Sequence, residues 1–197
     1  DDKPVDWIYA LVPSGDYEVI DDWHVLGMCA TGSKRVRCKD VFVPAYRILS
    51  MHVARPGHAW PGLALHRNPH YRIPTSALGG HTIGGCMVGN ARNALESMIT
   101  LVKERSTSYT GARMRDFQTV QLRIARAAAQ IDAAALLLRN DVLEAQALYE
   151  AGGSLDVEAK LRYKRNCALG GRLCVEAIDS LHEMAGANGI YDHFPLQ

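Results

Sequence analysis

The spacing of hydrophobic residues changes once along the chain, from alternation near the N-terminus to helical periodicity beyond about residue 75. Residues 6–44 contain four short segments rich in Val, Ile, Tyr and Trp, a composition typical of strands: DWIYALVP, YEVI, WHVLGM and KRVRCKDVFV. In the last segment Val36 and Cys38 alternate with basic residues, which predicts a half-buried strand. Pro44 is expected to end that strand, because proline has no N–H to donate to a sheet.

A proline-rich stretch follows the predicted strands. Residues 50–74 hold four prolines and four histidines, and the Pro-Gly pairs within them break regular structure. We therefore divide the chain into a β part at residues 1–49, a connecting loop at residues 50–74 and a helical part at residues 75–197. His66 and His70 fall in the loop, but the Asn-Pro pair between them prevents a helix from aligning the two imidazoles, so no metal site is predicted.

Three long helices are predicted in the helical part. The middle helix has the clearest pattern, because its apolar residues recur at steps of three and four: Phe117, Val120, Ile124, Ala127, Ile131, Ala134 and Leu138. Asp116 is expected to cap its start, and Gly152–Gly153 to end it. The flanking helices are expected at about residues 75–104 and 155–185. Long helices with short links form antiparallel bundles, so we expect three helices of a four-helix bundle, the fourth lying beyond Gln197.

Composition and charge narrow the class of protein. The 197 residues are 48% hydrophobic and 22% charged, with a formal net charge of +1. A nucleic-acid-binding domain usually has a clear basic excess, and a membrane span needs about 20 consecutive apolar residues; the sequence has neither. Five cysteines without a Cys-x-x-Cys pair indicate a reduced, cytoplasmic protein rather than a disulfide scaffold. The abrupt start and end suggest a part of a longer chain.

The link between the first two predicted helices could bind an anion. This segment, KERSTSYTGARMRDFQ, places Arg105, Arg113 and Arg115 among five hydroxyl side chains: Ser106, Thr107, Ser108, Tyr109 and Thr110. Guanidinium and hydroxyl groups are the donors that hold a phosphate. Composition alone favours an ordinary solvated link, so both interpretations stay open.

A second segment, HEMAGANGIYDHFPLQ, follows the third predicted helix. Gly186 and Gly189, with Asn188 between them, permit positive φ angles and a close approach of another group to the backbone. A plain helix stop needs only one of these glycines, and this alternative also stays open. Gly170–Gly171, inside the third helix, is attributed first to close helix packing and second to contact with a cofactor.

No catalytic residue is predicted. The sequence has no evident Ser/His/Asp triad, Walker loop or pair of carboxylates. Glu96, Glu104 and Glu144 fall on positions where a helix would expose them to solvent, so none is proposed as a general base.

Several of these segments resemble one known family. WHVLGMCATGSKRVRCKDVFVP resembles the end of the middle β domain in the acyl-CoA dehydrogenase fold, where the chain passes into a C-terminal four-helix bundle. Three segments are more closely similar to the flavin-dependent hydroxylases of two-component aromatic monooxygenases: GMCATGSKRV, HRNPHYRIP and RSTSYTGARMRDFQTVQLRIARAAAQIDAA. The resemblance covers the whole chain but only the rear half of such a protein. It implies a mixed, mostly α fold, with the end of an antiparallel β-barrel-like domain followed by an up-down helical bundle, truncated at both ends.

The resemblance also implies an activity. A separate flavin reductase would supply reduced FMN or FAD. The reduced flavin would react with O2 to form a C4a-hydroperoxyflavin, which would then hydroxylate a phenol or another small aromatic substrate. A homotetramer is implied as well. The alternatives are an acyl-CoA dehydrogenase or related FAD-dependent oxidase of the same fold, and a non-catalytic helical interaction module.

Residue by residue, the resemblance assigns a cofactor site. Arg105 matches an arginine that reaches a flavin phosphate across a subunit interface, and Tyr109 lies in the same link. Gly186, Ala187 and Asn188 match a turn that lines the ribityl and phosphate chain of the flavin. A weaker match places three residues of the proline-rich loop at the aromatic substrate pocket: Arg55, His58 and Trp60.

Overall fold

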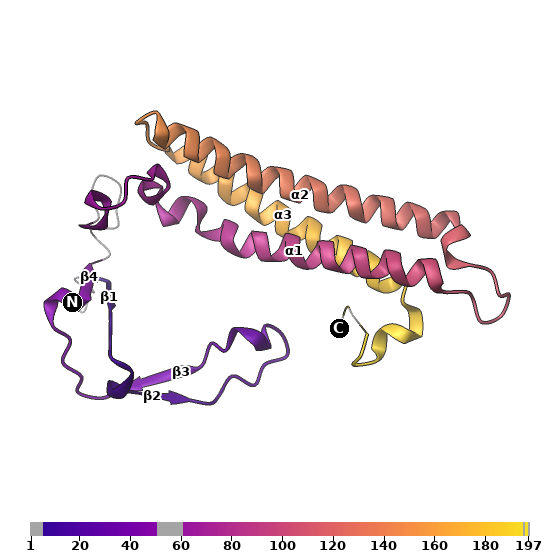
Figure 1. The fold of residues 1–197 in the computed structure, drawn as a ribbon, viewed down its shortest axis with the longest axis horizontal. Coiled ribbons are helices and arrows are strands. Elements are labelled where there is room, and N and C mark those ends of the chain that lie inside the picture. The colour runs from indigo at the N-terminus through magenta and orange to yellow at the C-terminus, as the bar shows by residue number, and fades with distance from the viewer. Residues whose placement is uncertain (1–5, 51–60, 195, 197) are drawn as a thin grey trace, which may run out of the picture. The chain divides into compact units, whose positions relative to one another are not determined.

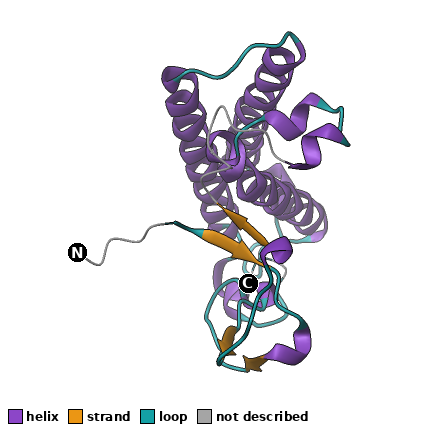
Figure 2. Cartoon of the chain, turned by 90° about the vertical axis from the view of Figure 1, so that its left-hand side faces the viewer, coloured by secondary structure: helices purple, strands orange, loops and turns teal. Residues whose placement is uncertain are grey.

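The computed structural model describes residues 6–50, 61–194 and 196, and the chain divides into two compact units at residues 1–65 and 66–197. The first unit contains two small antiparallel sheets, whose strands are drawn in orange in Figure 2. Strand β1 (Ile8–Ala10) pairs with β4 (Ile48–Ser50), and β2 (Tyr17–Ile20) pairs with β3 (Arg35–Cys38). The predicted β character of this region is therefore confirmed.

Two details of the predicted strands are wrong. The segment WHVLGM lies in the connection between β2 and β3, where the Trp23 indole N–H and the Thr31 hydroxyl both donate to the Met28 carbonyl at 3.1 and 2.9 Å. Met28 has a φ of 58°, and such local bonds compete with strand pairing. Strand β3 ends at Cys38, before Asp40 with its φ of 51°; Pro44 instead precedes a short turn that leads into β4.

The first unit shows no hydrophobic core of its own among residues 6–50, where every side chain is exposed or half-buried. Val36 of β3, expected to be half-buried, is 56% exposed, and Phe42 is 85% exposed. Two-stranded sheets are marginal in water without a packed face. The apolar side chains of this unit are therefore suited to packing against other protein surface.

The second unit is a bundle of three long helices that lie side by side in Figure 1. Helices α1 (Thr75–Glu104), α2 (Gln118–Glu150) and α3 (Val157–Glu183) agree with the three predicted helices. The predicted apolar stripe of α2 faces the other two helices, and five of its residues are buried: Val120, Ala127, Ile131, Ala134 and Leu138. Phe117 lies just before the helix and is 40% exposed.

The two ends of α2 differ in how well they were predicted. Its start is not capped by Asp116, because that residue lies in a short 3-10 turn (Met114–Asp116) and the N-cap position falls to Phe117, which makes no side-chain cap. Its end is as predicted: Gly152 has a φ of +78°, and the N–H groups of Gly152 and Gly153 donate to Tyr149 and Leu148. This pair of bonds is a Schellman motif.

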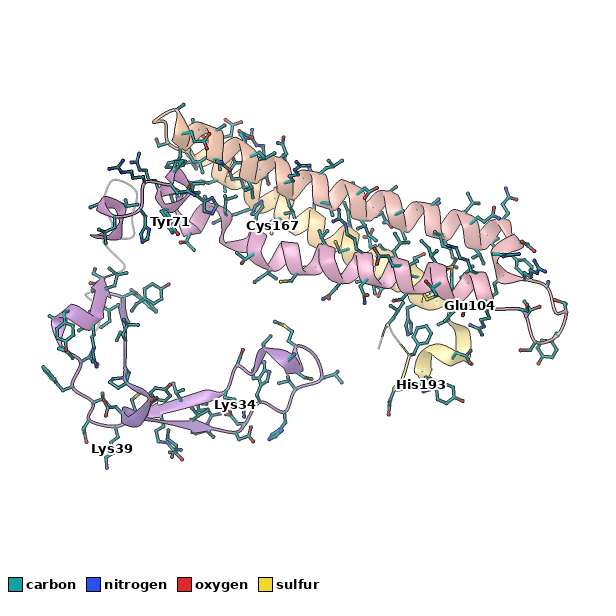
Figure 3. All side chains as sticks on the ribbon, in the orientation of Figure 1. Lys34, Lys39, Tyr71, Glu104, Cys167 and His193 are labelled. Carbon is teal, nitrogen blue, oxygen red and sulfur yellow. The ribbon has the colours of Figure 1, made fainter. Side chains whose placement is uncertain are left out.

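Glycines allow the helices to approach closely. A Cβ atom added to Gly84 of α1 would lie 3.0 Å from Leu138 of α2, and one added to Gly171 of α3 would lie 3.2 Å from Met87 of α1. Close packing therefore explains Gly170–Gly171, as expected. Cys174 is buried and Cys167, labelled in Figure 3, is half-buried. Burial raises the pKa of both thiols, which fits their predicted role as small apolar residues.

A buried polar cluster joins the three helices. Asp141 of α2 is fully buried, accepts a hydrogen bond from the Asn166 amide of α3 at 2.8 Å, and lies 3.0 Å from His81 Nε2 of α1. The guanidinium of Arg165 donates to the Asn166 side-chain oxygen and so fixes the orientation of that amide. The cluster thus supplies each helix with a polar partner inside the bundle. None of the described helices is both long and apolar enough to pass through a lipid bilayer.

We predict that Asp141→Ala lowers the free energy of unfolding by about 3 kcal/mol, because the side chains of His81 and Asn166 lose a buried acceptor. Urea denaturation followed by far-ultraviolet circular dichroism measures the change. Asp132→Ala is the matched control, since Asp132 lies on the exposed side of the same helix and its removal is expected to change stability by less than about 0.5 kcal/mol. Equal effects of the two substitutions would contradict a stabilising role for the cluster.

Candidate functional site

The basic, hydroxyl-rich link between α1 and α2 is a short hairpin. Ser106 and Arg113 form an isolated antiparallel bridge, the Thr107 N–H donates to the Ala112 carbonyl at 2.9 Å, and the Met114 N–H donates to the Arg105 carbonyl at 3.0 Å. Gly111 makes the turn with a φ of +65°. The link is thus ordered by backbone hydrogen bonds, and Arg105 begins the hairpin at the end of α1.

The turn after α3 begins with a left-handed glycine. Ala185 is in the right-handed helical region and Gly186 follows with a φ of +57°, at the start of a 3-10 helix over Gly186–Ile190. A right-handed residue followed by a left-handed one turns successive backbone N–H groups to one side, which favours an anion there. Gly189 does not have a positive φ, so that part of the prediction is wrong. It is needed for close approach, since an added Cβ would lie 2.9 Å from His182 Nε2.

The hairpin and the turn meet at one end of the bundle. Arg105 donates from Nη1 to the Ala185 carbonyl at 3.0 Å, although the two residues are 80 positions apart. In Figure 3, Glu104 and His193 mark the end of α1 and the segment after α3 at this same end. The structure therefore brings together the two segments that the sequence analysis selected separately.

A cavity of about 330 Å³ lies where they meet. Its lining includes Arg105, Ala185 and Gly186, together with three large apolar residues: Met114, Phe117 and Met184. Hydroxyl-bearing side chains of the hairpin complete that side: Ser106, Thr107, Ser108 and Tyr109. A cation, several hydroxyls and a left-handed glycine turn are the groups that hold a phosphate, with apolar side chains beside them to exclude water.

One carboxylate shares this cavity. Glu183, in the last turn of α3, lines it as well and would by itself disfavour an anion. Its carboxylate pairs with the guanidinium of Arg123 from α2, which offsets the negative charge. Arg105 has no carboxylate partner among the described ion pairs and donates only to a backbone carbonyl. The charge available to a ligand is therefore positive, and these residues fit a phosphate group.

The predicted site residues do not all line the cavity. Arg105, Tyr109 and Gly186 do, although Tyr109 is fully exposed at the tip of the hairpin. Ala187 and Asn188 are exposed beside it and are not in its lining. The substrate-pocket residues lie outside the described part of the chain: Arg55, His58 and Trp60.

Sequence reasoning missed some residues that the structure selects. Four residues that line the cavity were not predicted in the site: Met114, Phe117, Glu183 and Met184. His81, Asp141 and Asn166 were missed too. A signal for Asp141 existed, because it continues the apolar stripe of α2 three residues after Leu138. The three glutamates considered and rejected as bases are exposed, as predicted: Glu96, Glu104 and Glu144.

The chain is similar to known proteins along its whole length. The family described as acyl-CoA dehydrogenase, C-terminal domain, matches residues 81–197. The oxygenase subunit HsaA of a flavin-dependent monooxygenase from Rhodococcus jostii is 34% identical over 100% of this chain and 52% of its own length. The oxygenase component of an FADH2-dependent resorcinol hydroxylase from Rhizobium is 32% identical over 96% of this chain and 48% of its own.

A solved structure agrees with these sequence relatives. The crystal structure of 3-HSA hydroxylase from Rhodococcus superposes with a TM-score of 0.90 at 34% identity, covering 99% of this chain and 50% of that one. The chain thus spans about half the length of the relatives it matches. These matches confirm the resemblance and the predicted fold class.

Proposed function

The chain belongs to the acyl-CoA dehydrogenase C-terminal domain family, and on that premise we propose that its protein is the oxygenase component of a two-component flavin-dependent monooxygenase. It takes reduced FMN or FAD from a separate reductase and uses O2 to hydroxylate a phenol or another aromatic substrate. The observation that carries this proposal is the cavity between Arg105 and Gly186, in a chain whose relatives are named as flavin- or FADH2-dependent oxygenase components.

The residues of the cavity have distinct roles in this proposal. The Arg105 guanidinium holds the flavin phosphate with the N–H groups that it does not donate to Ala185. The backbone at Gly186, with Ala187 and Asn188 next to it, borders the ribityl and phosphate chain. Tyr109, exposed at the tip of the hairpin, borders the cavity on that side. The bound reduced flavin supplies the oxygen chemistry, while this part of the protein binds it, orients it and excludes water.

The substrate pocket belongs to the proposal as well. Arg55, His58 and Trp60 would border the aromatic ring, because an indole stacks on such a ring and a cation or imidazole hydrogen-bonds to a phenol oxygen. Five free cysteines without a disulfide among them support a reducing, cytoplasmic location.

We propose that the protein is a homotetramer, and the apolar surface of α2 supports self-association. Leu136 lies nine positions after buried Ala127, which is two and a half helical turns, so the two lie on opposite faces. Leu136 is 65% exposed and belongs to a second apolar stripe: Leu122, Ala125, Ala129, Ala133, Leu136, Leu143 and Ala147. A helix that is apolar on two opposite faces is suited to burial on both.

The family match also favours a second candidate, an acyl-CoA dehydrogenase or related FAD-dependent oxidase. The two activities differ in the reaction of the flavin. A dehydrogenase reduces its own flavin with the substrate, whereas the proposed monooxygenase receives reduced flavin and consumes O2. Product analysis therefore separates them.

The activity is tested with the complete gene product that contains this sequence. Loaded with reduced FMN or FAD and mixed with O2 and a panel of phenols, it is expected to form a hydroxylated product with one oxygen atom from labelled O2, detected by mass spectrometry. Bleaching of bound oxidised flavin by acyl-CoA thioesters, without hydroxylation of any phenol, would favour the dehydrogenase instead.

Arg105→Ala is predicted to weaken the binding of reduced FMN by about 1.5–3 kcal/mol, the range for hydrogen bonds to charged groups. Anaerobic titration of the complete gene product with reduced FMN measures this change. Arg139→Ala serves as the control, because Arg139 is an exposed arginine of α2 away from the cavity. Unchanged FMN affinity in Arg105→Ala would remove Arg105 from the cofactor site and with it the main support for the proposed function.

Leu136→Glu is predicted to shift the protein from tetramer toward smaller species, since it buries a charge in the proposed interface. Analytical ultracentrifugation measures the shift, and circular dichroism checks that the helices remain. Arg139→Glu on the polar flank of the same helix is the control and is expected to leave the assembly intact. An intact tetramer in Leu136→Glu would place the interface on another face.

A further inference from the structure

We propose that His182 is a positioning residue for the phosphate-binding turn: its ring holds the Gly189 carbonyl and thereby fixes the backbone at Gly186 against the ligand. This inference rests on the proposed function, because it treats the cavity at Gly186 as the site of the flavin phosphate. His182 does not line that cavity, so its effect on the ligand acts through the turn.

The contact between His182 and Gly189 is close. His182 lies in the last turn of α3, and its Nε2 is 3.2 Å from the Gly189 carbonyl oxygen, so the ring nitrogen donates and the carbonyl accepts. A Cβ on Gly189 would lie 2.9 Å from Nε2 and 3.1 Å from Cε1 of the same ring. The imidazole therefore packs directly on the Gly189 backbone, which only a glycine permits.

The ring is itself held in place. Phe194, which is 6% exposed, meets it edge to face with the ring centroids 5.8 Å apart. Aromatic pairs in this geometry restrict each other's orientation. The chain thus folds back over His182 after the turn. This contact restricts the orientation of the ring, in which Nε2 faces the Gly189 carbonyl.

The turn is consequently tied at both ends. Arg105 donates to the Ala185 carbonyl just before it, and His182 donates to the Gly189 carbonyl at its end. The residues between are exposed and carry little side chain, with Gly186 in the left-handed region: Gly186, Ala187 and Asn188. Their side chains are not packed, so the 3-10 hydrogen bonds of Gly186–Ile190 hold the shape of the turn, and the two ties hold the turn in place against the bundle. Loss of one tie frees N–H groups that must be aligned to bind an anion.

A purely structural role is the competing explanation. A histidine in the last turn of a helix also stabilises that helix by interacting with its C-terminal carbonyl groups. Such a role predicts lower stability with equal effects on any flavin. A positioning role predicts an effect confined to ligands that carry the phosphate.

The test compares FMN with riboflavin, which has the same ring and ribityl chain but no phosphate. In the complete gene product, His182→Ala is expected to weaken FMN binding by about fivefold to tenfold, the loss of one hydrogen bond, and riboflavin binding by less than about twofold. His182→Gln keeps an N–H donor near the position of Nε2 and is expected to restore most of the FMN affinity. Equal losses for both flavins, or no loss for FMN, would overturn the inference.

Gly189→Ala tests the same contact from the other side. Its Cβ collides with the His182 ring, so we expect the same selective loss of FMN affinity, and the double variant with His182→Ala is expected to lose less than the sum of the two single losses. Strict additivity would contradict a shared contact. If Arg105→Ala also leaves FMN affinity unchanged, the proposed function fails; if Arg105→Ala lowers it and His182→Ala does not, only the role of His182 fails.

Discussion

The close packing of α1 against α3 is the constraint on which the site depends. Small residues allow it: a Cβ on Gly80 would lie 3.1 Å from the Cys167 sulfur, and one on Gly171 would lie 3.2 Å from Met87. Both helices then run alongside each other, so the end of α1 and the end of α3 reach the same place. The bond from Arg105 to the Ala185 carbonyl is possible only because of this alignment.

The same packing places polar groups of the bundle in two environments, the buried interior and the helix ends. Inside, Asp141 binds His81 and Asn166, so that each helix contributes one side chain to a buried cluster. At the helix ends, the Arg105 guanidinium donates to the Ala185 carbonyl and has further N–H groups besides. A guanidinium that donates one bond to a carbonyl retains donors for a phosphate. The groups suited to binding a ligand therefore lie at the helix ends, whereas the buried polar groups contribute to the stability of the bundle.

Residue periodicity and turn-forming residues predicted the features that depend on interactions between neighbours in the sequence. The three helices, the apolar stripe of α2 and its Gly152–Gly153 stop follow from periodicity and from the left-handed preference of glycine. The cap at Asp116 failed because the 3-10 turn before α2 uses that residue. The sequence also indicated both halves of the cavity. Their contact could not be predicted, because it joins residues 80 positions apart through the packing of two helices.

The two apolar faces of α2 connect the site to assembly. One face packs inside the bundle, and the other, centred on Leu136, is exposed in the single chain. Tyr109, at the tip of the hairpin that begins with Arg105, is fully exposed as well, so one side of the cavity is open to surrounding solvent. A site that must exclude water needs cover on that side. In the homotetramer that we propose, a second subunit packed on the bundle would supply that cover, and Arg105, half-buried in its own chain, would belong to a site shared between two subunits.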